Sequence, residues 1–369
     1  MSLNYRSLIG IIVFSALTLG GCNDASEEPA KQETTPQQGV VEEKTATPAT
    51  ENTAKQKATP QGMDISLFAK DAFTQAPKIV DCETAEGTKT MCYELITSGA
   101  PAGRVPGPFC PRTTTDGAEV GGAWFNKEGT GELVDITGEF ILKLGEYYGD
   151  EKWVLYDAKT NKVRYTATKE GCLGAAKPDV EEQYKQNCIE CELSYLEDGF
   201  SRTFLIPTTP IPSTKTGQPN RLRTAGIALD GSELSGPAPV DAILGAYTIA
   251  AFDDCGGHTN VHQGYHYHST TGCTDKQTSD DGHAALVGYA ADGYGIYALK
   301  DEAGKEAEEL DECRGQTDDI RGYHYHAASP SANKIIGCLK GETVRPAGGD
   351  RRGPPPGDRP PPRDAAVKK

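Results

Sequence analysis

The sequence predicts a mainly β protein of the β-rich α+β class, in which a duplicated, pseudo-symmetric β module stapled by disulfides follows a smaller α+β domain. Three observations support this. Residues 253–268 align without a gap on residues 311–326, at a constant offset of 58. Short segments rich in β-branched and aromatic residues alternate with glycine, aspartate and proline in the second half of the chain, as is typical of β-sandwiches and barrels. Ten cysteines follow residue 62, and this even number allows five disulfides in an exported protein.

Residues 1–22 have the features of a lipoprotein signal peptide. The early basic residue Arg6 precedes an apolar run at residues 8–19, and small residues precede Cys22. This order fits a lipobox, so we expect lipidation of Cys22 and a membrane anchor; a plain secretory signal is the alternative. Asn23 favours the outer membrane of a diderm bacterium. We therefore expect a lipid-anchored protein of the cell envelope.

Two flanking segments are expected to be disordered. Residues 23–62 nearly lack large apolar side chains, so they cannot bury enough surface to offset their chain entropy. Residues 344–369 form a basic, proline-rich tail, for which an extended conformation is expected. Between them we expect an N-terminal domain at residues 63–194 and a second domain at residues 195–343. The net charge of −16 argues against nucleic acid as a partner.

The N-terminal domain is expected to contain one short helix and several strands. Apolar residues recur at helical spacing over residues 65–76. Segments rich in β-branched and aromatic residues occur at 132–144, 152–157 and 162–168. Turn residues at 157–162 predict a hairpin of residues 153–156 and 163–166. Residues 180–187 are expected to form one or two helical turns, and no catalytic constellation is evident here.

The second domain is expected to consist of many short strands. The predicted strands lie at residues 203–206, 224–229, 246–252, 286–289 and 295–299. The charged residues 302–311 predict an exposed turn or loop. Two repeats span residues 224–273 and 286–338, and each combines an Ala-x-Asp-Gly phrase, an Asp-x-Cys-x-Gly phrase and the pentapeptide Gly-Tyr-His-Tyr-His at 264–268 or 322–326.

These shared phrases resemble the YHYH-domain proteins, a bacterial extracytoplasmic family named for the tetrapeptide. The resemblance covers roughly residues 195–340, and both Tyr-His-Tyr-His copies are intact. It implies an exported protein of poorly defined activity, so it indicates a compartment rather than a mechanism.

The histidines predict a transition-metal site, because all seven lie within residues 258–326. Side chains at i and i+2 share one face of a strand, so each Tyr-His-Tyr-His run presents two imidazoles together. Neutral imidazole suits copper or zinc. The candidate ligands are His258, His262, His266, His268, His324, His326 and, as an additional ligand or a residue that supports one, His283.

Two arrangements of these ligands are open. The first repeat could hold one ion through His258, His262, His266 and His268, because the second repeat has Gln316 and Ile320 at the first two of these positions. Alternatively, the two His-x-His pairs could converge on one metal or a close pair. Asp253 and Asp311 could orient an imidazole or cap a turn. A purely structural role for the Tyr and His side chains is the simpler alternative.

The cysteines predict disulfides rather than thiolate ligands. The candidates are Cys82, Cys92, Cys110, Cys172, Cys188, Cys191, Cys255, Cys273, Cys313 and Cys338. The repeat suggests the pairs Cys255–Cys273 and Cys313–Cys338, although a Cys255–Cys313 pair has the same symmetry. Cys188 and Cys191 have Cys-x-x-Cys spacing, which is found at redox sites, but a structural role is expected because no thioredoxin-like context surrounds them.

Three functions follow from these features. The first is a membrane-anchored lipoprotein that sequesters or senses copper or zinc. The second is a metal-dependent enzyme of unidentified substrate, with Tyr267 or Tyr325 as a proton donor. The third is a disulfide-stapled structural or adhesion protein of the envelope.

Overall fold

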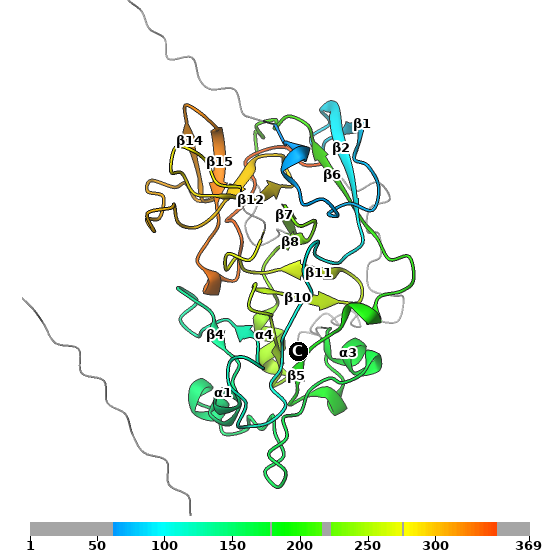
Figure 1. The fold of residues 1–369 in the computed structure, drawn as a ribbon, viewed down its shortest axis with the longest axis vertical. Coiled ribbons are helices and arrows are strands. Elements are labelled where there is room, and N and C mark those ends of the chain that lie inside the picture. Colours follow the sequence, from blue (N-terminus) through cyan, green and yellow to red (C-terminus); the bar gives the residue numbers. More distant parts are fainter. Residues whose placement is uncertain (1–61, 178, 216–222, 275–276, 345–369) are drawn as a thin grey trace, which may run out of the picture. The chain divides into compact units, whose positions relative to one another are not determined.

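A computed structural model describes residues 62–177, 179–215, 223–274 and 277–344. All of them belong to one compact unit, Lys55–Lys369. They form several β-sheets, short helices and five disulfides, which confirms the predicted β-rich α+β class (Figure 1). The predicted signal peptide with Cys22, the linker up to residue 61 and the tail from residue 345 lie outside the described residues.

A three-stranded antiparallel sheet contains β1 (Lys78–Glu83), β2 (Lys89–Thr97) and β6 (Arg202–Pro207), in that order. Its buried side chains pack with Phe68, which follows the 3-10 turn η1 (Ile65–Leu67). The helix predicted at residues 65–76 is reduced to this turn, because the backbone is already extended at Phe68. The strand predicted at 203–206 is present, but it pairs with β2 rather than with the strands that follow it.

A mixed region contains most of the helices. Its elements are β3 (Ala123–Trp124), β4 (Val134–Asp135), α1 (Gly138–Leu142), α2 (Leu144–Tyr148), α3 (Lys169–Ala175), η2 (Glu182–Tyr184), β5 (Cys188–Ile189), η3 (Leu193–Tyr195), α4 (Val240–Gly245) and β9 (Ile249–Ala250). Strand β5 pairs in parallel with β9, so the backbone is hydrogen-bonded across the boundary expected at residue 194. No helix among the described residues is long and apolar enough to cross a membrane.

The strand character predicted for residues 132–144 is wrong beyond β4. The Thr137 hydroxyl accepts a hydrogen bond from the Phe140 backbone N–H, which caps the start of α1. Ile141 in α1 and Leu144, which begins α2, are both buried and lie three residues apart in the chain. The capping residue and this spacing override the strand preference of the individual side chains. The hairpin predicted nearby is limited to a single bridge between Tyr156 and Val163.

The candidate site lies on an eight-stranded sheet. Its strands are β7 (Thr224–Ala228), β8 (Glu233–Ser235), β10 (Gly257–Asn260), β11 (Gly264–Tyr267), β12 (Leu286–Ala290), β13 (Gly295–Tyr297), β14 (Gly315–Asp318) and β15 (Gly322–His326). A last 3-10 turn, η5 (Pro330–Ala332), follows. The strand order is β10-β11-β8-β7-β12-β13-β15-β14. The strands predicted at 224–229, 286–289 and 295–299 are therefore present, whereas 246–252 contains only β9.

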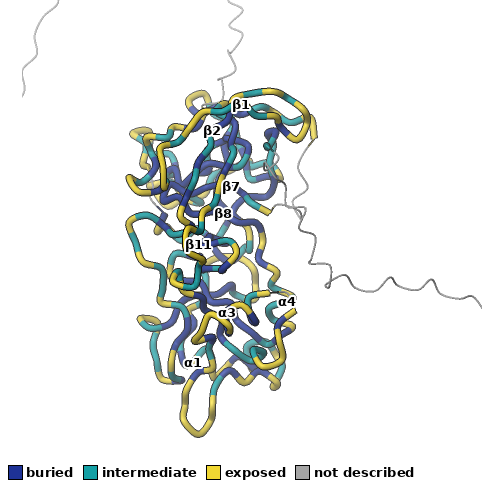
Figure 2. The backbone as a smooth tube through the Cα atoms, turned by 90° about the vertical axis from the view of Figure 1, so that its right-hand side faces the viewer, coloured by how far each residue is buried: buried dark blue, intermediate teal, exposed yellow. Residues whose placement is uncertain are grey.

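The two halves of this sheet have matching connections. On each side of the central β7–β12 pair, the next strand is antiparallel, the third is parallel to the second, and the outermost is antiparallel to the third. Strands β7 and β8 are almost entirely buried (Figure 2). The sheet therefore places β11 and β15 at equivalent positions, with four strands between them.

All ten cysteines among the described residues are paired. Cys255 bonds to Cys273 and Cys313 to Cys338, so each half of the large sheet has one local disulfide and no bond joins Cys255 to Cys313. The two members of the Cys-x-x-Cys segment have different partners, since the other bonds are Cys82–Cys92, Cys110–Cys188 and Cys172–Cys191. Cys188 and Cys191 are thus structural, and no thiolate is free for a metal in this part of the chain.

Candidate metal centre

Each Tyr-His-Tyr-His run is extended, and its alternate side chains lie on opposite faces. In β11 and the residue after it, the rings of His266 and His268 lie 4.9 Å apart, while those of Tyr265 and Tyr267 lie 5.1 Å apart. The second run has the same pairs, at 5.2 Å for the imidazoles and 5.3 Å for the phenols. This confirms the predicted alternation.

A glycine with positive φ precedes each run and ends the hairpin turn. Gly264 has φ 78° and Gly322 has φ 66°, a region that favours glycine. A Cβ atom on Gly264 would also lie 2.7 Å from the Cα of Gly99. The glycine therefore allows the tight turn after which the tyrosines and histidines alternate.

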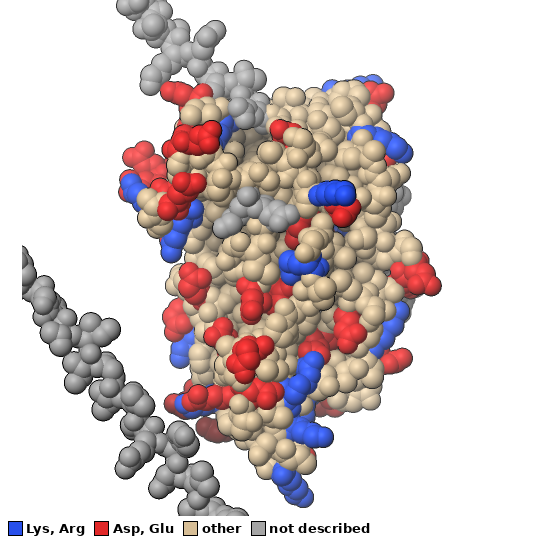
Figure 3. All heavy atoms as spheres, viewed as in Figure 1, with Lys and Arg blue, Asp and Glu red and all other residues tan. Residues whose placement is uncertain are grey.

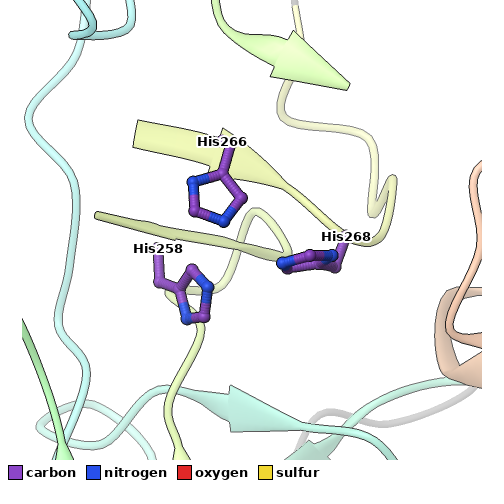
Figure 4. A group of neighbouring side chains, drawn as sticks. All are labelled: His258, His266 and His268. Carbon is purple, nitrogen blue, oxygen red and sulfur yellow. The ribbon is translucent and has the colours of Figure 1, made fainter. Parts of the chain in front are cut away.

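The first histidine cluster, triad 1, consists of His258, His266 and His268. His258 lies directly opposite His266 in the antiparallel β10–β11 pair. The ring centroids are 4.8, 5.3 and 4.9 Å apart, and one nitrogen from each ring lies within 4.8 Å of the others. Figure 4 shows the three rings grouped around a common space. Such a cluster can offer three nitrogen ligands to one ion.

The second cluster, triad 2, consists of His283, His324 and His326. Its ring centroids are 5.0, 5.1 and 5.2 Å apart, and its ligand nitrogens also lie within 4.8 Å of one another. Gln316 lies opposite His324 in the β14–β15 pair, at the position that His258 has in the first half. His283, from the loop before β12, supplies the third ring instead.

Backbone carbonyls orient most of these rings through Nδ1. His266 and His324 each have Nδ1 3.0 Å from a glycine carbonyl two residues earlier in the chain. Nδ1 of His268 lies 2.8 Å from the Gly236 carbonyl, and Nδ1 of His326 lies 3.2 Å from the Ala298 carbonyl, both in neighbouring segments. Nδ1 of His283 lies 2.9 Å from the carbonyl of the next residue, Ala284. A carbonyl accepts only, so Nδ1 carries the proton and Nε2 keeps its lone pair. This is the arrangement found for metal-bound histidines.

The Nε2 atoms of triad 2 crowd together. Nε2 of His283 lies 3.1 Å from Nε2 of His324. With both Nδ1 atoms protonated, two lone pairs face each other, and a cation between them would remove the repulsion. Two nitrogens that are each bound 2.0–2.1 Å from a tetrahedral zinc ion lie about 3.3 Å apart, which is close to the observed separation.

Burial keeps these imidazoles neutral. Loss of hydration lowers the pKa of His258, His266 and His268 to about 3, and the neighbouring imidazoles act in the same direction. Burial also lowers the pKa of His326 to about 4 and shifts that of His324 downward. The neutral form is the one that binds a metal, so these ligands need not lose a proton near pH 7.

We predict that acid destabilises the metal-free protein between pH 6.5 and pH 5. These histidines have lower pKa values when folded than the usual unfolded value of about 6.5, so the unfolded chain binds more protons. Stability is then complete above about pH 6.5 and falls by up to about 1.4 kcal/mol per pH unit for each such histidine. Urea unfolding over this range measures the slope. A His266→Gln, His268→Gln variant should have a shallower slope than the exposed control His262→Ala, and equal slopes would contradict this.

The phenol face is held by carboxylates. The Tyr265 and Tyr323 hydroxyls donate to Asp253 and Asp311, at 2.8 and 3.0 Å. Both aspartates also accept backbone N–H groups of their own turns. Of the two roles considered, they therefore cap turns and hold tyrosines, and none of these contacts is to an imidazole.

Two further aspartates escaped the sequence reasoning. The Tyr267 hydroxyl donates to Asp230 and the Tyr325 hydroxyl donates to Asp292, both at 2.6 Å. Burial raises the pKa of both carboxyls. The signal was present, because each aspartate belongs to a repeated Ala-x-Asp-Gly phrase. Arg104 adds a charge-assisted bond of 2.8 Å to Asp253 and one of the same length to the Tyr267 hydroxyl.

The structure departs from both ligand arrangements considered above. His262 lies on the exposed turn between β10 and β11 and is not part of triad 1. Strand β10 ends at Asn260, so His262 belongs to the turn rather than to the strand that carries His258. The two His-x-His pairs do not converge either, because four strands separate β11 from β15. Instead, each half of the sheet has its own triad.

The fold and the site define a β-rich, disulfide-bonded protein with two buried histidine triads. Residues 203–309 match the family model described as YHYH protein, so this segment is a YHYH family domain. The match includes triad 1 and His283 and ends before β15, so it covers a shorter range than the resemblance expected at residues 195–340. Comparisons with curated proteins and with solved structures gave no significant match.

Proposed function

We propose that this chain is an extracytoplasmic protein that binds two transition-metal ions, one at each triad, and thereby sequesters or senses the metal. The observation that carries the proposal is the convergence of three ligand nitrogens within 4.8 Å at each of two equivalent places. The carbonyl anchors on Nδ1 support it, because they direct Nε2 toward the shared space.

Copper is the preferred ion, followed by zinc. Imidazole nitrogen binds both, and neither triad offers a carboxylate as one of its three ligands. The cysteines of the described chain are oxidised, which disfavours a cysteine-rich structural zinc site.

The five disulfides suggest a compartment outside the cytoplasm. We extend this to a lipid anchor on Cys22 and to the outer membrane, on the strength of the lipobox sequence and Asn23. The membrane and the metal are the proposed partners. We do not propose nucleic acid as a partner, because the net charge is −16. Figure 3 shows acidic and basic side chains interspersed over one face, with no continuous basic patch among the described residues on it.

We further infer that the eight-stranded sheet arose by internal duplication. Residues 253–268 and 311–326 share nine of sixteen positions. The matching strand order, the equivalent tyrosine–aspartate pairs and the two local disulfides support this inference. Duplication accounts for two sites, and the exchange of His258 for Gln316 accounts for their difference.

Metal analysis of the purified protein tests the proposal. After exposure to copper or zinc and dialysis against metal-free buffer, elemental analysis should find two ions per chain. A protein that retains no metal would contradict the proposal and would favour the structural or adhesion alternative, in which the histidines only pack.

A metal-dependent enzyme is the second candidate. It is favoured by one observation, a cavity of about 1300 Å³ whose lining includes all three histidines of triad 1. Catalysis by a bound metal needs an open coordination position next to such a space.

A further inference from the structure

The two triads differ in what lies against their ligand nitrogens. In triad 2 the side-chain amide of Gln316 reaches across from β14. Its Nε2 atom lies 2.9 Å from Nε2 of His326 and 3.3 Å from Nε2 of His324. These separations match those between neighbouring ligands of one ion, so the amide occupies the place of a fourth ligand.

Gln316 can serve either state of triad 2. Without a metal, its NH₂ group donates to the bare Nε2 atoms of both histidines. The amide oxygen and nitrogen exchange places when the group turns by 180°. Were a metal bound, the turned amide would present its carbonyl oxygen Oε1 as a fourth donor atom beside the three imidazoles.

At the position where triad 2 has the Gln316 amide, triad 1 has its third imidazole, His258. Within the described part of the chain, no side-chain amide is hydrogen-bonded to the triad 1 rings, and these rings line a cavity. His258, His266 and His268 all line the space of about 1300 Å³, together with polar and apolar residues that include Arg202, Ser235 and Ile243. Glu233, which is the register partner of His266 on β8, is paired with Arg202 at 2.5 Å, so its charge is already balanced.

We propose that the ion in triad 1 keeps one coordination position for a small external anion, whereas in triad 2 Gln316 fills this position. The proposal rests on the proposed function, since it requires a metal at both triads. Three neutral imidazoles leave the charge of a divalent ion uncompensated, which favours an anionic fourth ligand in a partly apolar cavity. Triad 1 is thus the reactive or exchanging site, and triad 2 is the closed one.

Azide binding to the protein loaded with two copper(II) ions tests this assignment. Azide bound to copper(II) gives a charge-transfer absorption band, and its titration counts open positions. We expect one azide per chain. The band should vanish in the His266→Ala, His268→Ala variant and persist at full intensity in the His324→Ala, His326→Ala variant.

Variants of Gln316 test the other half of the proposal. Gln316→Ala should raise the uptake from one azide to two per chain, whereas Gln316→Glu keeps a donor oxygen and should leave it at one. Gln183→Ala, at an exposed glutamine, is the matched control and should also bind one.

The proposed binding of two metal ions and the proposed open position at triad 1 can be refuted separately. If the chain does not retain two copper ions, the proposed function is contradicted. If it retains two and the band survives in the His266→Ala, His268→Ala variant, or two azides bind without any substitution, the assignment of the open site is overturned. The assignment is also overturned if the Gln316→Ala variant still binds one azide per chain.

Discussion

Replacement of both His266 and His268 by alanine is expected to lower the metal content from two ions per chain to one. The double substitution leaves His258 as the last member of triad 1, and a single imidazole does not hold an ion through dialysis. Triad 2 is separated from these residues by the strands between β11 and β15 and should stay loaded. Elemental analysis after dialysis gives the stoichiometry directly.

The reciprocal variant and a nearby control complete this test. His324→Ala, His326→Ala should also retain one ion, and the quadruple variant none. His262→Ala should retain two, because His262 lies on the exposed turn outside triad 1. An unchanged content in either double variant would move the metal away from the Tyr-His-Tyr-His strands.

Replacement of Tyr325 by alanine is expected to destabilise the protein by about 4 kcal/mol, the usual range for a large buried aromatic side chain. Tyr325 is fully buried, and its hydroxyl donates to the buried carboxylate of Asp292 at 2.6 Å. Tyr325→Phe keeps the ring but removes the hydroxyl that donates to Asp292 and accepts the Lys340 backbone N–H, which leaves both partners without this bond at a cost of about 2 kcal/mol. Urea unfolding at pH 7.5 of the metal-free protein measures both.

Tyr323→Phe is the matched control for the loss of the Tyr325 hydroxyl. Tyr323 is on the same strand and also donates to an aspartate, Asp311, but it is only partly buried. We expect a cost below about 1 kcal/mol. Equal costs at Tyr323 and Tyr325 would show that the buried Asp292 contact has no special part in holding the strand that carries His324 and His326.

The sequence predicted the local geometry of the histidine clusters better than it predicted which residues belong to each cluster. The period of two along a strand correctly paired His266 with His268 and His324 with His326. His258 was found because it lies in the same hairpin. The structure places His262 outside this cluster, and spacing alone does not say which residues of a hairpin form its turn.

The sequence named His283 as an additional ligand or a residue that supports one, but could not assign it to a cluster. It lies 41 residues before His324, and the strands β12, β13 and β14 come between them in the chain. Its approach depends on the parallel pairing of β13 with β15 and on the path of the loop before β12, which no local pattern encodes. The contact of Gln316 with His324 and His326 was not predictable either, because glutamine in place of histidine indicates the loss of an imidazole ligand.

The fold was predictable where strands are short and bounded by turn residues, as for β7, β12 and β13. It was not predictable where tertiary pairing decides, as for β6, which joins β2 from more than 100 residues away. Over α1 and α2, a capping threonine and the buried residues Ile141 and Leu144 outweighed strand preference. The local disulfides of the two repeats followed from their shared spacing, whereas Cys110–Cys188 connects distant segments.

The central claim is that each triad holds one metal ion, and anomalous X-ray diffraction at the copper and zinc edges tests it most directly. The account predicts two anomalous peaks per chain in crystals of the loaded protein. One should lie about 2.0–2.1 Å from Nε2 of His266 and the other at the same distance from Nε2 of His324. A single peak between the two strands, peaks only at surface residues such as His262, or none at either triad would contradict it.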